Sequence, residues 1–256
     1  MPSVFTSRAG AVLTITLNRS EVYNAFNREL HAALYDALGD AAAADIRAVV
    51  ITGAGKAFCA GQDLKEFQEL SGSVGDVLEA SYHPNVRRIR ALEKPVIAAV
   101  NGVAAGAGLS LACACDLRIA SSAAALVPGF AGIGLVPDAG GTWFLERLLG
   151  YARAFEWMGS NRRLAADEAL AWGLVSAVLP EEDFAAGIAE LAARWAAAPT
   201  RAVAFAKRLF EHAHDAPLEK QLALEAELQQ EATQTADFRE GMAAFLEKRP
   251  PRFTGS

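Results

Sequence analysis

The architecture is signalled most clearly by one run of residues, Val96-Ile97-Ala98-Ala99-Val100-Asn101-Gly102-Val103-Ala104-Ala105-Gly106-Ala107-Gly108. Its first five residues are apolar and partly β-branched, which predicts a buried strand, and the glycines that follow predict a tight turn. The apolar continuation to Cys115 predicts a short buried helix. The segment from Pro95 to Cys115 carries no charge, but its glycines, Asn101 and Ser110 favour this strand, turn and helix over a membrane span.

The same succession recurs through the first two-thirds of the chain, where short β-branched runs alternate with stretches of helical periodicity. The predicted strands are 12–17, 48–52, 95–100, 116–120 and 174–179, and the predicted helices are 27–44, 76–92, 108–115 and 142–149. Strands that lead repeatedly into helices indicate an α/β core with crossover connections. After about Ala185 the chain becomes helical, and Pro199 and Pro217 divide this tail into three predicted helices. We expect the tail to pack on its own core or on another subunit.

Composition narrows the class of protein. Of 256 residues, 24 are Lys or Arg and 30 are Asp or Glu, which gives a net charge of −6. This charge argues against a protein whose main function is to bind nucleic acid. The three cysteines (Cys59, Cys113 and Cys115) cannot all pair, and none has partners at metal-site spacing. We therefore expect reduced thiols and no metal ion. The first residues lack the apolar run of a secretory signal, which favours a cytoplasmic location.

Two glycine turns share one design. The run Phe58-Cys59-Ala60-Gly61-Gln62-Asp63-Leu64 follows the strand 48–52 and opens a predicted helix, as the run 101–108 does after its own strand. Small residues at the start of a helix expose backbone N–H groups that lack a partner within the helix. Together, the two turns suggest an oxyanion hole assembled from separate segments. The plainer alternative for the first turn is that Asp63 simply caps a helix.

A third run, Gly134-Leu135-Val136-Pro137-Asp138-Ala139-Gly140-Gly141-Thr142-Trp143, places a single carboxylate in an uncharged stretch from Ser121 to Thr142. Burial of a carboxylate among apolar groups raises its pKa toward the range that suits proton transfer. The competing interpretation is that Asp138 caps the helix that begins near Gly141. Composition alone leaves the two interpretations equally supported.

In this order, Asn24-Ala25 and the runs 58–64, 101–108 and 134–142 resemble the enoyl-CoA hydratase/isomerase (crotonase) superfamily over nearly the whole chain. The resemblance implies an α/β fold of repeated β-β-α units that form a superhelix, with an acyl-CoA-binding core at 1–195. It also implies a helical region at 196–256 that builds homotrimers, often paired into hexamers. The substrate would be an acyl-CoA thioester, with no cofactor besides the CoA that the substrate carries. By resemblance, the oxyanion amides are those of Gln62 and Ala107.

The resemblance also implies a set of residues that bind CoA or the acyl group, and these are Ala25, Ala60, Gln62, Asp63, Leu64, Lys65, Phe130, Lys248 and Phe253. Asp63 and Asp116 both stand at element boundaries, where Asp commonly caps or stabilises a turn, so we expect structural roles for them. Cys59 is expected to be a small packing residue. For His83 two positions stay open, at the entrance of the acyl pocket or in a surface turn.

Departures from the family pattern point to a particular reaction. Hydratases of this family use two glutamates, and their positions here hold Ser110 and Phe130. Neither residue transfers a proton as a carboxylate does, so Asp138 is left as the expected catalytic residue, which suits an isomerisation. The run 136–143 and the ending Arg252-Phe253-Thr254-Gly255 resemble the phenylacetate-pathway isomerases, which convert 1,2-epoxyphenylacetyl-CoA to an oxepin thioester and are related to Δ3,Δ2-enoyl-CoA isomerases.

Three alternatives remain beside the isomerase. The first is a hydratase-like enzyme. The second is a 4-chlorobenzoyl-CoA dehalogenase-like enzyme, although those enzymes carry a Trp eight residues before the Asp, where this chain has Phe130. The third, from another class, is a non-catalytic protein of the same fold that binds RNA or serves as a scaffold, against which the negative net charge argues.

Overall fold

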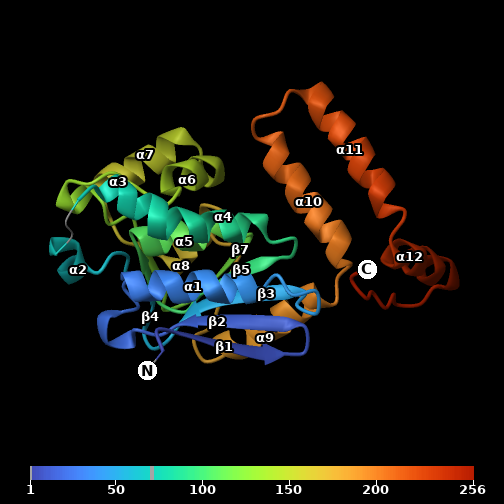
Figure 1. The fold of residues 1–256 in the computed structure, drawn as a ribbon, viewed down its shortest axis with the longest axis horizontal. Coiled ribbons are helices and arrows are strands. Elements are labelled where there is room, and N and C mark those ends of the chain that lie inside the picture. The colour runs from blue at the N-terminus through green and yellow to red at the C-terminus, as the bar shows by residue number, and fades with distance from the viewer. Residues whose placement is uncertain (1, 70–71) are drawn as a thin grey trace.

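The computed structural model describes residues 2–69 and 72–256 and contains two sheets (Figure 1). The larger sheet has the strand order β1 (Val4–Ala9), β2 (Val12–Leu17), β3 (Ala48–Gly53), β5 (Val96–Val100), β7 (Leu117–Ser121) and β10 (Ala177–Leu179). The smaller sheet has the order β4 (Ala57–Cys59), β6 (Val103–Ala105), β8 (Ala125–Val127) and β9 (Leu164–Ala165). Only the terminal pairs β1–β2 and β8–β9 are antiparallel among the described ladders.

Three central strands of the larger sheet each lead into a strand of the smaller sheet and then onward to a helix. The units are β3–β4–α2 (Leu64–Gln68), β5–β6–α5 (Ala107–Ala114) and β7–β8–α6 (Gly141–Leu149). Consecutive turns stack, because Gly53 N–H donates to Asn101 Oδ1 and Asn101 Nδ2 donates to Gly55 O, each at 3.1 Å. A Cβ atom at Gly102 would lie 2.1 Å from Lys56 O, so the stack requires glycine there. The predicted superhelix of β-β-α units is confirmed.

The central strands β3 and β5 of the larger sheet are buried on both faces, as parallel strands usually are. Helices α1 (Arg28–Asp40), α4 (His83–Ala91) and α5 belong to the core on one side, which includes Ile15, Ile51 and Ala98. Helix α9 (Phe184–Ala196) packs on the other side against Val50 and Ile97. This double cover explains why every residue of β5 is buried.

Two predicted helices are shorter or more divided than their apolar periodicity indicated. The helix predicted at 27–44 ends at Asp40, because the buried Lys94 ammonium group draws the carbonyls of Ala43 and Ile46 into hydrogen bonds of 2.9 and 2.8 Å. The helix predicted at 76–92 divides into α3 (Val74–Val77), a π-helical turn (Leu78–Tyr82) and α4. Pro84 has no N–H group to donate, so a regular helix cannot run through this point.

Other boundaries follow from local contacts. The strand predicted at 174–179 begins only at Ala177, because Leu174 N–H bonds back to Ala169 O of α8 (Ala166–Ala171) and Leu174 O accepts from Arg118. Segment 95–115 forms the predicted strand β5 and the predicted helix α5, but the predicted glycine turn between them contains a further strand, β6, that was not predicted. Throughout residues 2–69 and 72–256, the structure holds no helix with the length and apolar character that crossing a membrane requires. Before the C-terminal helices, the other described helical elements are Ser20–Val22, Ala131–Ile133 and α7 (Tyr151–Ser160).

The C-terminal helices α10 (Thr200–Ala213), α11 (Leu218–Ala232) and α12 (Ala236–Glu247) extend away from the two sheets (Figure 1). The predicted breaks at Pro199 and Pro217 are confirmed, since each proline directly precedes a helix. A further break at 233–235 was not predicted, and there Thr235 Oγ1 accepts from Phe238 N–H and caps α12. The predicted division between 1–195 and 196–256 stays a prediction.

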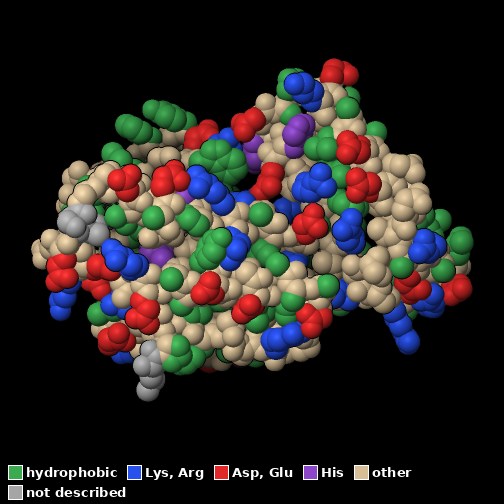
Figure 2. All heavy atoms as spheres, in the orientation of Figure 1, with side chains coloured by type: hydrophobic (Ala, Val, Ile, Leu, Met, Phe, Trp, Pro, Cys, Tyr) green, Lys and Arg blue, Asp and Glu red, His purple; other side chains and the backbone are tan. Residues whose placement is uncertain are grey.

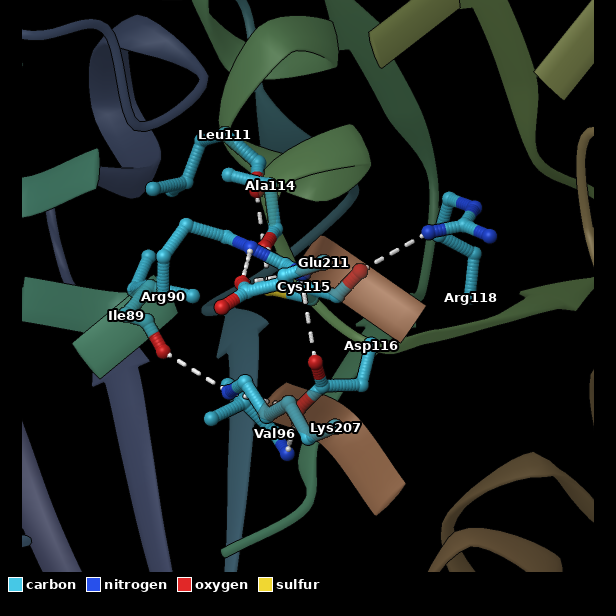
Figure 3. A network of polar contacts seen from close by, with 10 residues as sticks. All are labelled: Ile89, Arg90, Val96, Leu111, Ala114, Cys115, Asp116, Arg118, Lys207 and Glu211. Carbon is cyan, nitrogen blue, oxygen red and sulfur yellow. Dashed lines mark hydrogen bonds and ion pairs between the residues drawn. The ribbon is translucent and has the colours of Figure 1, made fainter. Parts of the chain in front are cut away.

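Asp116 anchors α10 to the core (Figure 3). Its carboxylate accepts from Val96 N–H at 2.8 Å and from Lys207 Nζ of α10 at 3.0 Å. Arg90 bonds both Asp116, at 3.2 Å, and Glu211 of α10, at 2.7 Å. The structural role expected for Asp116 is therefore confirmed.

Candidate active site

The two glycine turns meet at the amino end of α5. A Cβ atom at Gly61 would lie 2.9 Å from Ala105 O and 3.4 Å from Ala107 N. Both glycines that precede the candidate amides have positive φ angles, +90° at Gly61 and +53° at Gly106, a conformation in which glycine avoids the steric cost of a side chain. The close approach of the two backbones therefore requires glycine at position 61, and the positive φ angle favours glycine at position 106.

Two backbone amides are left without a partner where the turns meet. Phe26 pairs with its neighbours across the first turn, since Phe26 N–H donates to Gly61 O and Asp63 N–H donates to Phe26 O, at 2.7 and 2.9 Å. Neither the Gln62 N–H nor the Ala107 N–H donates to any acceptor within the described part of the chain. Ala107 is also the first residue of α5, where the helix carries its positive end. The pair can bind an oxygen atom that carries negative charge.

A cavity of about 620 Å³ opens onto both amides. Most of its wall is apolar and comes from α3, the π-helical turn and the loop before α6. Six residues predicted for the site line it, namely Ala60, Gln62, Leu64, Ala107, Phe130 and Asp138. The structure thus brings the two amides and the predicted acid–base group into one enclosure.

Asp138 lines this cavity and has no structural role in the described contacts. Its Oδ1 atom is buried and has no hydrogen-bond partner among the described residues. Helix α6 begins at Gly141 with no side-chain cap, so the capping interpretation of Asp138 is wrong. Burial raises the pKa of Asp138 from 3.8 to about 6, and a nearby charge on His83 opposes this rise in part. A carboxyl group that titrates near neutral pH suits both the acceptance and the return of a proton.

The two positions that hold glutamates in hydratases carry no acid here. Ser110 is buried, its Oγ lies 3.5 Å from Gly106 O, and a Cβ atom at Gly141 would lie 2.6 Å from that Oγ. Phe130 is buried and lines the cavity. Asp138 is therefore the only carboxylate among the described residues of the cavity wall.

Asp63 has the structural role expected of it. Its carboxylate pairs with Arg19 at 2.8 Å and caps α2 by accepting from Lys65 N–H at 3.1 Å. The hydrogen bond from Arg19 lowers the pKa of Asp63. Arg19 also donates to Ala25 O, which fixes the loop that carries Asn24.

Five residues predicted to bind CoA or substrate are absent from the described cavity wall, and these are Ala25, Asp63, Lys65, Lys248 and Phe253. Lys248 ends α12, and the Phe253 carbonyl accepts from Arg47, so both belong to the C-terminal region. Their contacts with CoA stay predictions. Cys59 is buried and burial raises the pKa of its thiol to about 12, which fits a packing residue.

The segment from α3 to the start of α4 supplies residues of the wall that the sequence did not single out, chiefly Val77, Leu78 and Tyr82. Tyr82 is buried, and burial followed by the nearby Asp138 raises its pKa. His83 lines the cavity as well, which agrees with the pocket-entrance alternative. The signal available in the sequence was the His83-Pro84 pair, because a proline at the start of a helix perturbs the preceding turn.

Comparison with known proteins gives a consistent picture. Residues 7–256 match the model of the family described as enoyl-CoA hydratase/isomerase. A probable enoyl-CoA hydratase of Rhodobacter capsulatus is 48% identical, over 94% of this chain and 93% of its own. The 1,2-epoxyphenylacetyl-CoA isomerase of Escherichia coli is 44% identical, over 95% of each chain. The crystal structure of an enoyl-CoA hydratase from Bacillus anthracis superposes with a TM-score of 0.94 at 35% identity, over 99% of this chain and 100% of that one.

Proposed function

Because the chain belongs to the enoyl-CoA hydratase/isomerase family, we propose that it is an acyl-CoA isomerase in which Asp138 alone moves the proton. One observation carries the proposal. Asp138 Oδ1, which is buried and has no partner among residues 2–69 and 72–256, lines the same cavity as the amides of Gln62 and Ala107, which donate to no acceptor among those residues.

The two amides would bind the thioester carbonyl oxygen of the substrate. Removal of a proton from the carbon next to that carbonyl leaves an electron pair, which moves onto the oxygen as an enolate. Donors that are already oriented toward this oxygen stabilise the developing charge by about 3 kcal/mol each. Gly61 and Gly106 hold the donors in place before the substrate arrives.

Asp138 would take that proton as a carboxylate and return it, as a carboxylic acid, to another carbon of the conjugated system. No proton, electron pair or water is gained or lost in total, so the reaction is an isomerisation and needs no cofactor. The pKa of Asp138, raised by burial to about 6, makes both of its protonation states accessible near neutral pH. Addition of water would need a second acid or base, and Ser110 and Phe130 do not supply one.

For the substrate, we propose 1,2-epoxyphenylacetyl-CoA, a Δ3,Δ2-enoyl-CoA, or both. A largely apolar cavity of about 620 Å³ suits an aromatic ring or a medium alkenyl chain. The 44% identity to a 1,2-epoxyphenylacetyl-CoA isomerase supports the first substrate. The 48% identity to a probable enoyl-CoA hydratase keeps hydration as the second candidate function.

The test is turnover of a panel of CoA thioesters that carry 3-enoyl, 2-enoyl, 4-chlorobenzoyl and epoxyphenylacetyl groups. We expect isomerisation of the first or the last and no more than trace hydration of the 2-enoyl thioester. Asp138→Asn should lose the isomerase activity while its circular dichroism spectrum is unchanged. Rapid hydration by the wild type, or an active Asp138→Asn variant, would overturn the proposal.

We further propose that α11 and α12 assemble the protein into a homotrimer or a hexamer. Helix α11 buries only Leu228 among its described residues. Figure 2 shows hydrophobic side chains among charged ones over the C-terminal helices, and the exposed ones of α11 and α12 include Leu218, Leu222, Phe238, Met242, Phe245 and Leu246. Large apolar side chains left exposed on helices that bury so few residues of their own are typical of an interface between subunits. Light scattering of the wild type and of a Phe245→Glu, Leu246→Glu variant tests the assembly.

The three cysteines are buried and unpaired, which fits a reducing compartment. On this ground we propose the cytoplasm as the location of the enzyme. Fractionation of the native host followed by immunodetection tests it.

A further inference from the structure

The described wall of the cavity holds a third ionisable side chain, His83, besides Asp138 and Tyr82. His83 comes from the start of α4, whereas Asp138 comes from the loop before α6, and both line the same wall. About a third of the His83 side chain is exposed, at 30%, so the ring lies at the boundary between cavity and solvent.

The backbone geometry at His83 is unusual. His83 N–H donates to Leu78 O, five residues earlier, which defines the π-helical turn. Such turns are rare and occur mostly as single turns inserted into α-helices, frequently at functional sites. Here the turn brings Leu78, Tyr82 and His83 to the cavity wall together.

Glu79 fixes the His83 ring from the solvent side. Its Oε1 lies 3.0 Å from His83 Nδ1, and its Oε2 accepts from Arg87 at 3.1 Å. A carboxylate at Nδ1 fixes the orientation of the ring and favours a proton on that nitrogen. The other ring nitrogen, Nε2, has no hydrogen-bond partner among the described residues.

We infer that His83, held by Glu79, is a positioning residue that acts through Asp138. Its positive ring stabilises the Asp138 carboxylate inside an otherwise apolar cavity and thereby keeps this group able to accept a proton. The ionisable groups around His83 are Glu79 on the π-helical turn, Arg87 behind Glu79, Tyr82 beside it and Asp138 from the facing loop. Of these, Asp138 is the one that burial disfavours as an anion, so it gains most from a nearby cation.

The inference rests on the proposed function in one respect, because the proposed function assigns proton transfer to Asp138. The interaction inferred between His83 and Asp138 is testable in the resting protein without substrate. Nuclear magnetic resonance of aspartate labelled with ¹³C at the side-chain carboxyl follows the Asp138 titration directly, and Asp138→Asn assigns the signal. Because Asp138 and His83 are inferred to interact, the Asp138 titration curve depends on the charge of both side chains.

We expect His83→Gln to move the midpoint of the Asp138 titration upward by about one pH unit, because it removes a nearby positive charge. His83→Lys restores a permanent charge and should return the midpoint toward the wild-type value. His212→Gln on α10 is the matched control, since His212 bonds Gln221 away from the cavity, and it should change nothing.

A second readout is the acid limb of kcat/KM for isomerisation, which should shift in the same direction in His83→Gln. An unchanged or lowered Asp138 midpoint in a folded His83→Gln protein would overturn the inference. So would a His83→Lys variant that behaves like His83→Gln. Failure of the proposed function looks different, because Asp138→Asn would then stay active whether or not the two titrations are coupled.

Discussion

Asp63 and Asp138 make an instructive comparison, because each follows a glycine or proline turn just before a helix. Asp63 caps α2 and pairs with Arg19 at 2.8 Å, so its carboxylate is fully occupied. Asp138 stands three residues before α6, does not cap it, and keeps a buried oxygen that has no partner in the part of the chain that the structure describes. The same side chain in a similar sequence setting is structural in one loop and free for chemistry in the other.

The difference between the two loops lies in their surroundings. The hydrogen bond from Arg19 lowers the pKa of Asp63, whereas burial raises that of Asp138 to about 6. Asp63 therefore stabilises the fold as an anion, and Asp138 weakens it as an anion. An arrangement that costs stability and is retained at a cavity wall is typical of a functional site.

The largest expected effect comes from Asp138→Asn. We expect isomerase kcat to fall by about 10³-fold, because the variant lacks the only carboxylate of the described cavity wall. Stability should change in the opposite sense. The folded-state pKa of Asp138 is raised from 3.8 to about 6, so the penalty for ionisation is absent below pH 3.8 and complete above pH 6. The variant should gain up to about 3 kcal/mol at pH 8 and almost nothing at pH 3.5.

Calorimetric melting of both proteins across this pH range checks the prediction, with activity measured on the same samples. A variant that is less stable than the wild type at pH 8 would mean that Asp138 has a structural partner after all.

Gly61→Ala tests the role of the Gln62 amide as an oxyanion donor, whereas Asp138→Asn tests the proton-transfer group. The added Cβ would lie 2.9 Å from Ala105 O at a φ of +90°, so the first turn must move and carry the Gln62 N–H with it. Loss of one oxyanion donor lowers kcat by about 10²-fold. Gly10→Ala has a comparable φ of +59° with open space around it, and serves as the control for backbone strain alone. Steady-state kinetics in which both variants lose kcat equally would contradict the assigned role of Gln62.

Restoring acids at the hydratase positions should not restore hydration. In a Ser110→Glu, Phe130→Glu variant, the longer side chain at 110 meets Gly141, whose own Cβ position is only 2.6 Å from Ser110 Oγ. We therefore expect the loop that carries Asp138 to shift and isomerase activity to fall about tenfold, since proton transfer depends closely on geometry. Absorbance of the 2-enoyl thioester follows any hydration, and efficient hydration would show that the Asp138 loop tolerates the change.

Asp63→Asn should have the smallest effect on rate, within about threefold, because Asp63 is absent from the described cavity wall. The free energy of unfolding should fall by about 1 kcal/mol at neutral pH through loss of the partly buried pair with Arg19. The folded-state pKa of Asp63 is lowered, so this stabilisation is present above its ordinary pKa of 3.8 and disappears as the pH falls. Urea titration at pH 7 and at pH 3 measures both values, and equal losses at the two pH values would contradict the pairing.

The repeated strand, turn and helix of the core could be predicted because its signals are local. Apolar β-branched runs, glycines at the turns and proline at helix starts act within a few residues. The same reasoning placed the two amide turns and Asp138, although it left the capping interpretation of Asp138 open. That question was settled by burial and by the start of α6 at Gly141, and both depend on packing.

Other features could not be predicted because they depend on distant partners. Helix α1 stops early where Lys94, about fifty residues away, draws on the carbonyls of the next turn. The π-helical turn divides a helix that periodicity showed as continuous, and it is this turn that brings Tyr82 and His83 to the cavity. Periodicity records which residues are apolar, but it does not record where a helix gains a residue.

The most direct test of the account is a crystal structure with an unreactive acyl-CoA analogue bound. We predict that its thioester oxygen lies about 3 Å from both the Gln62 and Ala107 nitrogens, with an Asp138 carboxylate oxygen within van der Waals contact of the carbons next to the carbonyl. A thioester oxygen bound elsewhere, or Asp138 turned away from the acyl group, would contradict the central claim that two amides and one carboxylate perform the reaction.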